Sequence, residues 1–254
     1  MLKFFRKIRQ HLIAEKKISN YLLYALGEIV LVVIGILIAL AINNANEQRI
    51  KREKEQVYLK GLKEEFETSK LKLEELIRFN TNSYNAAIEI VKIMDQKESP
   101  SEQKLSELFV TAFAYDIFFN PNNSLLNEMI NSGSLKDINN NSLRIKLTNW
   151  IATIDDISNQ EQMQDEQRNS TVNAFRDEGH SIRTILDHTG MSEKLGIPVD
   201  EKAISNLSVL ESTTFQNNIL MFIITSQSTE TEHYNPLLFQ LESILKVIDQ
   251  ELEQ

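Results

Sequence analysis

Cysteine is absent from this 254-residue chain, which excludes disulfides and thiolate metal sites. Helix breakers are also scarce, with seven glycines and four prolines in a chain that holds many Leu, Ile, Glu, Lys, Gln and Asn residues. Such a composition favours helix over sheet. Neither strand-like alternation with turn pairs nor an internal repeat is visible, so the sequence predicts an all-α protein.

Motifs for catalysis are missing as well. The sequence has no P-loop, no G-x-S-x-G and no H-E-x-x-H, and the lack of cysteine removes a thiol nucleophile. We therefore predict that the protein is not an enzyme, and we expect no catalytic residue, no metal and no cofactor.

Two histidine clusters keep a metal-dependent alternative open. Glu230 and His233 form an E-x-x-H step, the spacing that puts a carboxylate and an imidazole on one face of an α-helix in di-iron proteins. A di-iron site needs two such steps and two further glutamates, and only one step is present. The other cluster combines Asp177, Glu178, His180, Asp187 and His188, which lie near glycines.

Basic residues are few after the N-terminal region. Residues 1–42 hold six Lys or Arg and two Glu, whereas residues 43–254 hold 21 basic and 34 acidic residues. So acidic a body offers no basic stripe that could release counterions from phosphates, which excludes nucleic acid as a partner.

Charge is nearly absent from residues 21–42, YLLYALGEIVLVVIGILIALAI, where Glu28 is the single charged residue. At 1.5 Å per residue these residues form roughly 33 Å of helix, which matches a hydrocarbon core. A secretory signal has an apolar core of only about 7–15 residues. We therefore predict a transmembrane helix that is retained as a signal anchor, with the cleavage-like triplet Ala39-Leu40-Ala41 as the alternative.

The flanks of this span set its orientation. Residues 1–20 form a basic tail whose apolar residues recur at helical spacing, as in an interfacial amphipathic helix. Six basic residues precede the span, and the five that follow it closely are diluted by Glu47, Glu53 and Glu55. The positive-inside rule then predicts a single-pass protein of a bacterial inner membrane, with a cytoplasmic N-terminus and a periplasmic body.

Polar and small residues mark two candidate features of the span. An ionised Glu28 near the midplane is costly, so this side chain should be protonated, reach toward the headgroups or pair with another helix. Gly27, Gly35 and Ala39 fall on one helical stripe, which allows close approach of a second helix. Besides the lipid bilayer, the expected partner is a second copy or another membrane protein, and the alternative is an ordinary anchor with a tolerated polar group.

The block YLLYALGEIVLVVIGILIALAINNANEQR, preceded by FFRKIRQ, resembles the N-terminal signature of an uncharacterised family of single-span membrane proteins. This family is common in Bacteroidota and is known only as a domain of unknown function. Weaker similarity follows in residues 123–147 and 235–252, and Ala45 stands where family members commonly carry Trp. The resemblance implies the membrane topology and no enzymatic activity.

The rest of the chain predicts a long charged helix or stalk over residues 43–98, followed by an extracytoplasmic antiparallel helical bundle over residues 99–254. Apolar residues of the long helix fall on alternating three- and four-residue steps, a broken heptad pattern that fits a coiled coil or a bundle helix. The same register passes through three polar residues, and the cluster at 80–83 is a candidate bend. The apolar positions are Leu59, Leu62, Phe66, Leu73, Leu76, Ala87, Ile90 and Met94. The polar positions are Ser69, Asn80 and Ser83.

Three local patterns complete the interpretation. Ser99 and Pro100 predict the start of a helix that runs to about Phe119. The aromatic residues within 113–119 are expected in the core rather than around a ligand. The asparagine-rich stretches at 120–123 and 139–141 are expected to be caps and turns.

The leading hypothesis is a membrane-anchored, non-enzymatic protein that presents an acidic helical bundle for protein-protein interaction or self-assembly. One alternative is an extracytoplasmic, sensor-like ligand-binding domain that signals through a membrane partner. The other is a metal-dependent enzyme centred on His233.

Overall fold

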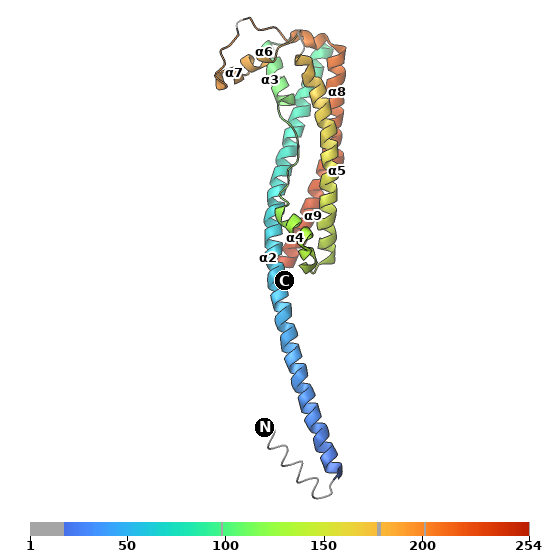
Figure 1. Ribbon diagram of the computed structural model, residues 1–254. Coiled ribbons are helices and arrows are strands. Elements are labelled where there is room, and N and C mark those ends of the chain that lie inside the picture. The colour runs from blue at the N-terminus through green and yellow to red at the C-terminus, as the bar shows by residue number, and fades with distance from the viewer. Residues whose placement is uncertain (1–17, 98, 177–178, 201, 254) are drawn as a thin grey trace. The chain divides into compact units, whose positions relative to one another are not determined.

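The computed structural model describes residues 18–97, 99–176, 179–200 and 202–253 (Figure 1). These residues form helices joined by loops, and no strand occurs among them. The chain divides into two compact units, residues 1–56 and 57–254. The predicted all-helical class is therefore confirmed for the described part of the chain.

Helix α2, Ile18–Gln96, supplies the apolar segment of the first unit. Its large aliphatic side chains from Leu22 to Ile42 are exposed, and Leu23 leaves 74% of its surface uncovered. Within the described residues, one helix is long and apolar enough to cross a membrane, and this segment lies in it. Such a segment has the length and composition of a membrane anchor or a signal sequence. The predicted basic tail lies outside the described residues, apart from the helical residues 18–20.

The second unit continues α2 and adds a series of helices. Side-chain oxygens of Ser101, Asn140, Ser181 and Ser212 accept hydrogen bonds from backbone N–H groups three residues later, which fixes the start of four helices. The elements are α3 (Glu102–Phe113), α4 (Ser124–Ser132), η1 (Ser134–Asp137), α5 (Asn141–Val172), η2 (Asn173–Phe175), α6 (Ile182–His188), α7 (Met191–Lys194), η3 (Leu207–Glu211), α8 (Thr213–Ser228), η4 (Thr229–Tyr234) and α9 (Asn235–Leu252).

The first of two hydrophobic cores joins α2, α4, the first half of α5, and α9. At its centre the rings of Phe66 and Trp150 lie 5.0 Å apart, and both side chains are buried. Full burial of a large apolar side chain contributes roughly 1.5–3 kcal/mol. The remaining anchors of this core include Leu59, Leu62, Leu126, Leu147, Leu241 and Ile244.

The second core joins the end of α2, α3, η2 and α8. Phe113 of α3 meets Phe222 of α8 edge to face, with ring centroids 5.0 Å apart. Phe175 of η2 packs against Phe109 and Phe215, at 4.1 Å and 5.6 Å between centroids. α5 thus packs against α9 in the first core and against α8 near the second.

Between these cores lies a polar layer, which we define as Asn80, Gln164, Ser226 and Thr229, all of them buried. Gln164 Nε2 donates to Asn80 Oδ1 (2.8 Å) and to Ser226 Oγ (3.1 Å), and Asn80 Nδ2 donates to the backbone carbonyl of Ser226 (3.0 Å). The polar layer joins α2, α5 and α8. The amide donors of Asn80 and Gln164 have partners, which offsets much of the cost of their burial, whereas the buried Gln164 Oε1 makes no hydrogen bond to the described residues.

A π-helical segment, η4, follows α8 directly and leads into α9. Its closing bond runs from the N–H of Asn235 to the carbonyl of Glu230, five residues earlier. Thr229, the first residue of η4, belongs to the polar layer and accepts a hydrogen bond from Gln160 Nε2 (3.1 Å). Single π-helical turns are rare within α-helices, and those that occur are often found at functional sites.

One local prediction is wrong. The helix expected from Ser99 to about Phe119 begins instead at Glu102, behind the cap Ser101, and ends at Phe113. Arg168 Nη1 donates to the carbonyl of Phe113 (3.0 Å), one of the carbonyls left free at the helix end, and residues 114–123 form a loop. Helix α2 runs without interruption through the candidate bend at residues 80–83, where Asn80 bonds α8, and the bend stays a prediction.

Candidate functional site

The residues singled out in the predicted span all lie on α2. Gly27, Gly35 and Ala39 are exposed, and Glu28 is partly exposed. A Cβ atom added at Gly27 or Gly35 would meet nothing within 4 Å, so these glycines leave an open surface on the helix. The spacing of the three small residues along α2 places them toward one side of an ideal helix. Their role, and that of Glu28, stays a prediction.

The E-x-x-H step does not form the expected helical face, because Glu230 and His233 lie in the π-helical segment η4. The Glu230 carboxylate turns to α2 instead. It accepts hydrogen bonds from Thr81 Oγ1 (2.8 Å), Asn80 Nδ2 (3.1 Å) and the hydroxyl of Tyr84 (3.3 Å). Glu230 therefore links η4 to α2 beside the polar layer.

The second histidine cluster is only partly described, since Asp177 and Glu178 lie outside the described residues. Hydrogen bonding from the Ser192 hydroxyl, together with Arg183 Nε at 3.1 Å, holds the pKa of Asp187 below its usual range. Across the described ranges, no group of three or more His, Asp and Glu side chains is close enough together to hold a metal ion.

The aromatic residues expected in the core separate into two groups. Phe113 is buried in the second core, as predicted. Tyr115 and Phe118 are exposed, with 68% and 45% of their surface uncovered, and Phe119 is partly buried. The prediction is wrong for Tyr115 and Phe118 because α3 ends before them.

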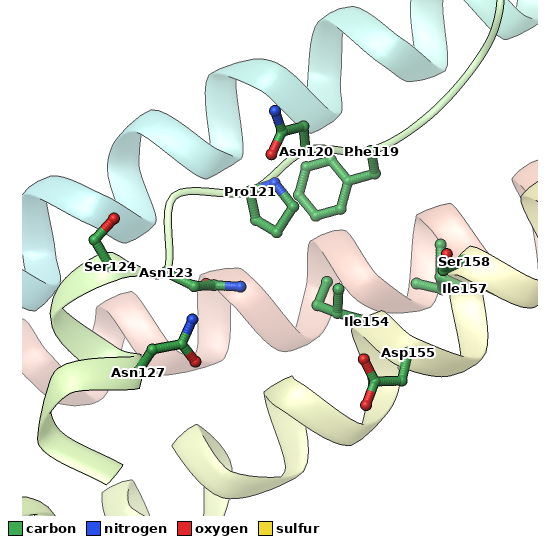
Figure 2. Close-up of a pocket in the computed structure, with 10 residues that line it drawn as sticks. All are labelled: Phe119, Asn120, Pro121, Asn123, Ser124, Asn127, Ile154, Asp155, Ile157 and Ser158. Atoms are coloured by element: carbon green, nitrogen blue, oxygen red, sulfur yellow. The ribbon is translucent and has the colours of Figure 1, made fainter. Parts of the chain in front are cut away.

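A pocket with a volume of about 400 Å³ lies beside the loop that follows α3. The loop forms one wall, the start of α4 a second, and the middle of α5 a third (Figure 2). The lining residues are Phe119, Asn120, Pro121, Asn123, Ser124, Asn127, Ile154, Asp155, Ile157 and Ser158. The amides of Asn123 and Asn127 and the carboxylate of Asp155 thus lie close to aromatic and aliphatic side chains, while the Asn120 amide lies on the far side of Phe119 and Pro121 (Figure 2).

Hydrogen bonds from α5 hold the loop in place. The N–H of Phe119 donates to Glu161 Oε1 (2.8 Å), and Trp150 Nε1 donates to Asn123 Oδ1 (2.9 Å). Because Asn123 uses its oxygen for the indole, its amide nitrogen keeps its donors (Figure 2). Hydrogen bonds with α5 therefore fix the position of the loop at Phe119 and at Asn123.

Helix α2 fixes the other side of the loop. The N–H of Asn122 donates to Ser69 Oγ (2.9 Å), while Lys72 Nζ donates to the carbonyl of Asn120 (3.0 Å) and to Asn122 Oδ1 (2.6 Å). Lys72 therefore points its charge at the outer side of the loop and is not among the residues that line the pocket.

The N-terminus of α4, at the edge of the pocket, is already capped. Glu65 of α2 accepts hydrogen bonds from the N–H groups of Leu125 (2.7 Å) and Leu126 (3.3 Å). A carboxylate at this position satisfies the free N–H groups and the positive end of the helix dipole. An anionic ligand in the pocket would therefore find this end of α4 occupied.

Glu161 is the buried carboxyl next to the pocket. It accepts hydrogen bonds from the N–H of Phe119 and from the hydroxyl of Tyr234, both at 2.8 Å. Burial raises the pKa of Glu161 to about 7, although these two donors oppose the shift. Burial also raises the pKa of Tyr234, and the nearby carboxylate adds to that effect.

Sequence reasoning missed the pocket, Glu161 and Gln164. The only signal for the pocket is the asparagine-rich stretch at 120–123, which is equally typical of turns. Glu161 lies in the polar sequence QEQMQDEQRNS, where nothing distinguishes a buried carboxyl from an exposed one. Their burial depends on contacts between residues far apart in the chain.

One family model, described as a family of unknown function (DUF6090), matches residues 28–169 of the chain. Neither the curated proteins nor the solved structures contain a match.

Proposed function

This chain belongs to the family of unknown function DUF6090, and from that premise we propose a membrane-anchored, non-enzymatic protein that presents an antiparallel helical bundle for protein-protein interaction or self-assembly. The observation that carries the proposal is the exposure of every large aliphatic side chain from Leu22 to Ile42 on α2. Exposed apolar surface on that scale requires lipid or another apolar helix as a cover.

The proposed topology has the basic tail in the cytoplasm and the acidic body in the periplasm of a bacterial inner membrane. Six basic residues before the span and the acidic residues after it support this orientation. Reporter fusions at the two ends of the chain test it directly. Activity of a periplasmic reporter at Gln254 is expected, and activity of a cytoplasmic reporter there contradicts the topology.

Association is proposed to use the side of α2 that carries Gly27, Gly35 and Ala39. Small residues on one stripe let two helix backbones approach closely, and Glu28, which lies beside this stripe, would then have a route to a polar partner away from lipid. The second unit has its own hydrophobic cores, one on each side of the polar layer.

The absence of cysteine makes the interface directly testable by crosslinking. We expect Ala39→Cys to form a disulfide-linked dimer when native membranes are oxidised. Leu37→Cys, at nearly the same depth but on the opposite side of the helix, is the matched control and should stay monomeric. Equal yields at the two positions contradict self-association through this stripe.

Two further changes test the named residues in the Ala39→Cys background. Gly35→Leu should reduce the dimer yield severalfold, because the larger side chain separates the helices. Glu28→Gln should also reduce it if the carboxylate is part of the contact. If neither change affects the dimer yield, the crosslink arises from random collision, and association through this stripe is contradicted.

A further inference from the structure

We propose that the pocket beside the loop at residues 114–123 binds a neutral, hydroxyl-rich small molecule such as a mono- or disaccharide. The site lies wholly within the second unit and is independent of association through α2. Its volume of about 400 Å³ falls in the range of roughly 300–1,000 Å³ that is typical of small-molecule sites.

The hydrogen-bonding groups of the pocket match hydroxyl groups. Asn127 makes no side-chain hydrogen bond to other described residues, so its amide offers both donors and an acceptor to a ligand. Asn123 adds its amide nitrogen, since its oxygen accepts from Trp150. Figure 2 shows the amides of Asn123 and Asn127 at the mouth of the pocket, whereas the Asn120 amide lies on the far side of Phe119 and Pro121. A hydroxyl both donates and accepts, as an amide does, and neighbouring hydroxyls can use both ends of one amide.

The charges around the pocket favour a neutral ligand. Asp155 is the one charged residue in the lining, and no Lys or Arg belongs to it. The α4 N-terminus, which could otherwise attract an anion, is capped by Glu65. A phosphate or carboxylate would therefore enter a site with negative charge and without a counterion, whereas the Asp155 carboxylate can accept hydrogen bonds from hydroxyls.

The apolar lining residues are a second feature of the pocket that favours a saccharide as ligand. The rings of Phe119 and Pro121 lie side by side on the loop, opposite Ile154 and Ile157 of α5 (Figure 2). A saccharide presents apolar C–H faces as well as hydroxyl edges, so it can cover this floor while its edge bonds the amides. A small polar solute without such a face, such as urea, could not cover the floor.

The chain carries its own reporter of binding. Trp150 is the single tryptophan, it is buried, and its indole N–H bonds the pocket residue Asn123. The test uses the full chain in phosphatidylcholine nanodiscs, because maltoside and glucoside detergents would themselves compete. Glucose, N-acetylglucosamine and maltose are titrated while Trp150 emission and ligand saturation-transfer NMR are followed, with glucuronate and glucosamine as charged comparisons.

We expect at least one neutral sugar to bind and to bind better than both charged sugars. Asn127→Ala should weaken binding about tenfold, since it removes hydrogen bonds to the ligand. Asn131→Ala, one turn further along α4 and outside the pocket, is the matched control and should bind normally. Both side chains lie at exposed positions, so thermal unfolding should be unchanged.

Three results would overturn the assignment. One is that no neutral sugar of the panel binds. Another is that glucuronate or glucosamine binds more tightly than every neutral sugar. The third is that Asn127→Ala does not weaken binding. None of these results bears on the Ala39→Cys crosslink, so the two proposals can fail separately.

Discussion

The hydroxyl of Tyr234 donates a 2.8 Å hydrogen bond to the carboxylate of Glu161, and both side chains are buried. Tyr234 is the last residue of η4, and Glu161 lies in the middle of α5, so the bond ties the π-helical segment to the central helix. Among the described residues, no lysine or arginine forms an ion pair with this carboxylate. Protonation of Glu161 is therefore linked to folding.

Glu161→Gln should remove a pH dependence of stability. The folded protein holds the Glu161 proton up to a pKa of about 7, against an ordinary value of 4.5. The contribution of Glu161 to stability is thus fully present below about pH 4.5 and is lost as the pH rises toward about 7. Between pH 5 and 8 the wild type should lose about 2–3 kcal/mol relative to Glu161→Gln. Urea unfolding of the full chain at several pH values measures the difference.

The control for this experiment is Glu166→Gln, which changes an exposed glutamate five residues further along the same helix. Its pH profile should follow the wild type. A Glu161→Gln profile that is also parallel to the wild type contradicts the buried, protonated state.

Tyr234→Phe should destabilise the protein more at pH 8 than at pH 5. At pH 8 the Glu161 carboxylate is ionised and loses one of its two donors, at a cost of about 1–3 kcal/mol. At pH 5 the carboxyl is protonated and needs the donor less. Tyr115→Phe, at an exposed position, should be neutral at both values. A loss from Tyr234→Phe that is equal at both pH values would show that the hydroxyl acts only through packing.

The helical class and much of the core follow from the sequence, because they depend on local periodicity. The apolar positions Leu59, Leu62, Phe66 and Leu73 recur at helical spacing, and all four are buried. The polar interruptions in that register were visible too, and Asn80 is indeed buried at one of them. Sequence periodicity could not tell that Gln164 and Ser226, on other helices, would supply its partners.

The pocket could not be predicted, because its walls are placed by contacts between distant residues. The carbonyl at the end of α3, that of Phe113, is bonded by Arg168, 55 residues later, and the loop is held by Glu161 and Ser69, which are 42 and 53 residues from their partners. A local pattern at 99–119 gives no information about such bonds. Only the three-dimensional arrangement distinguishes the asparagines of a turn from those that face a pocket.

Ser101→Ala should destabilise α3, and Ser99→Ala should not. Ser101 Oγ accepts from the N–H of Lys104 at 3.1 Å, so its loss leaves a helix N-terminus uncapped. The expected cost is about 1 kcal/mol in the free energy of unfolding. Ser99 lies at the start of the helix that the sequence predicts and serves as the matched control. Urea unfolding of the two variants decides between them, and a larger loss for Ser99→Ala contradicts the observed start of the helix.

Asn80→Ala should be among the most destabilising single changes in the second unit. Asn80 is bonded to Gln164, to the carbonyl of Ser226 and to the carboxylate of Glu230, and it is fully buried. Removing its amide leaves buried donors and acceptors of the polar layer without partners and adds a small cavity, at a cost of about 2–4 kcal/mol.

Asn82→Ala is the matched control for this change, two residues away on the same helix but exposed, and it should be nearly neutral. Asn80→Leu separates the two parts of the cost, since it refills the volume but still removes one of the two hydrogen bonds that the Gln164 amide donates. If Asn80→Leu is as stable as the wild type, the polar layer does not need its hydrogen bonds. If both Asn80 variants are strongly destabilised, the two hydrophobic cores depend on this buried network for their connection through α2, α5 and α8.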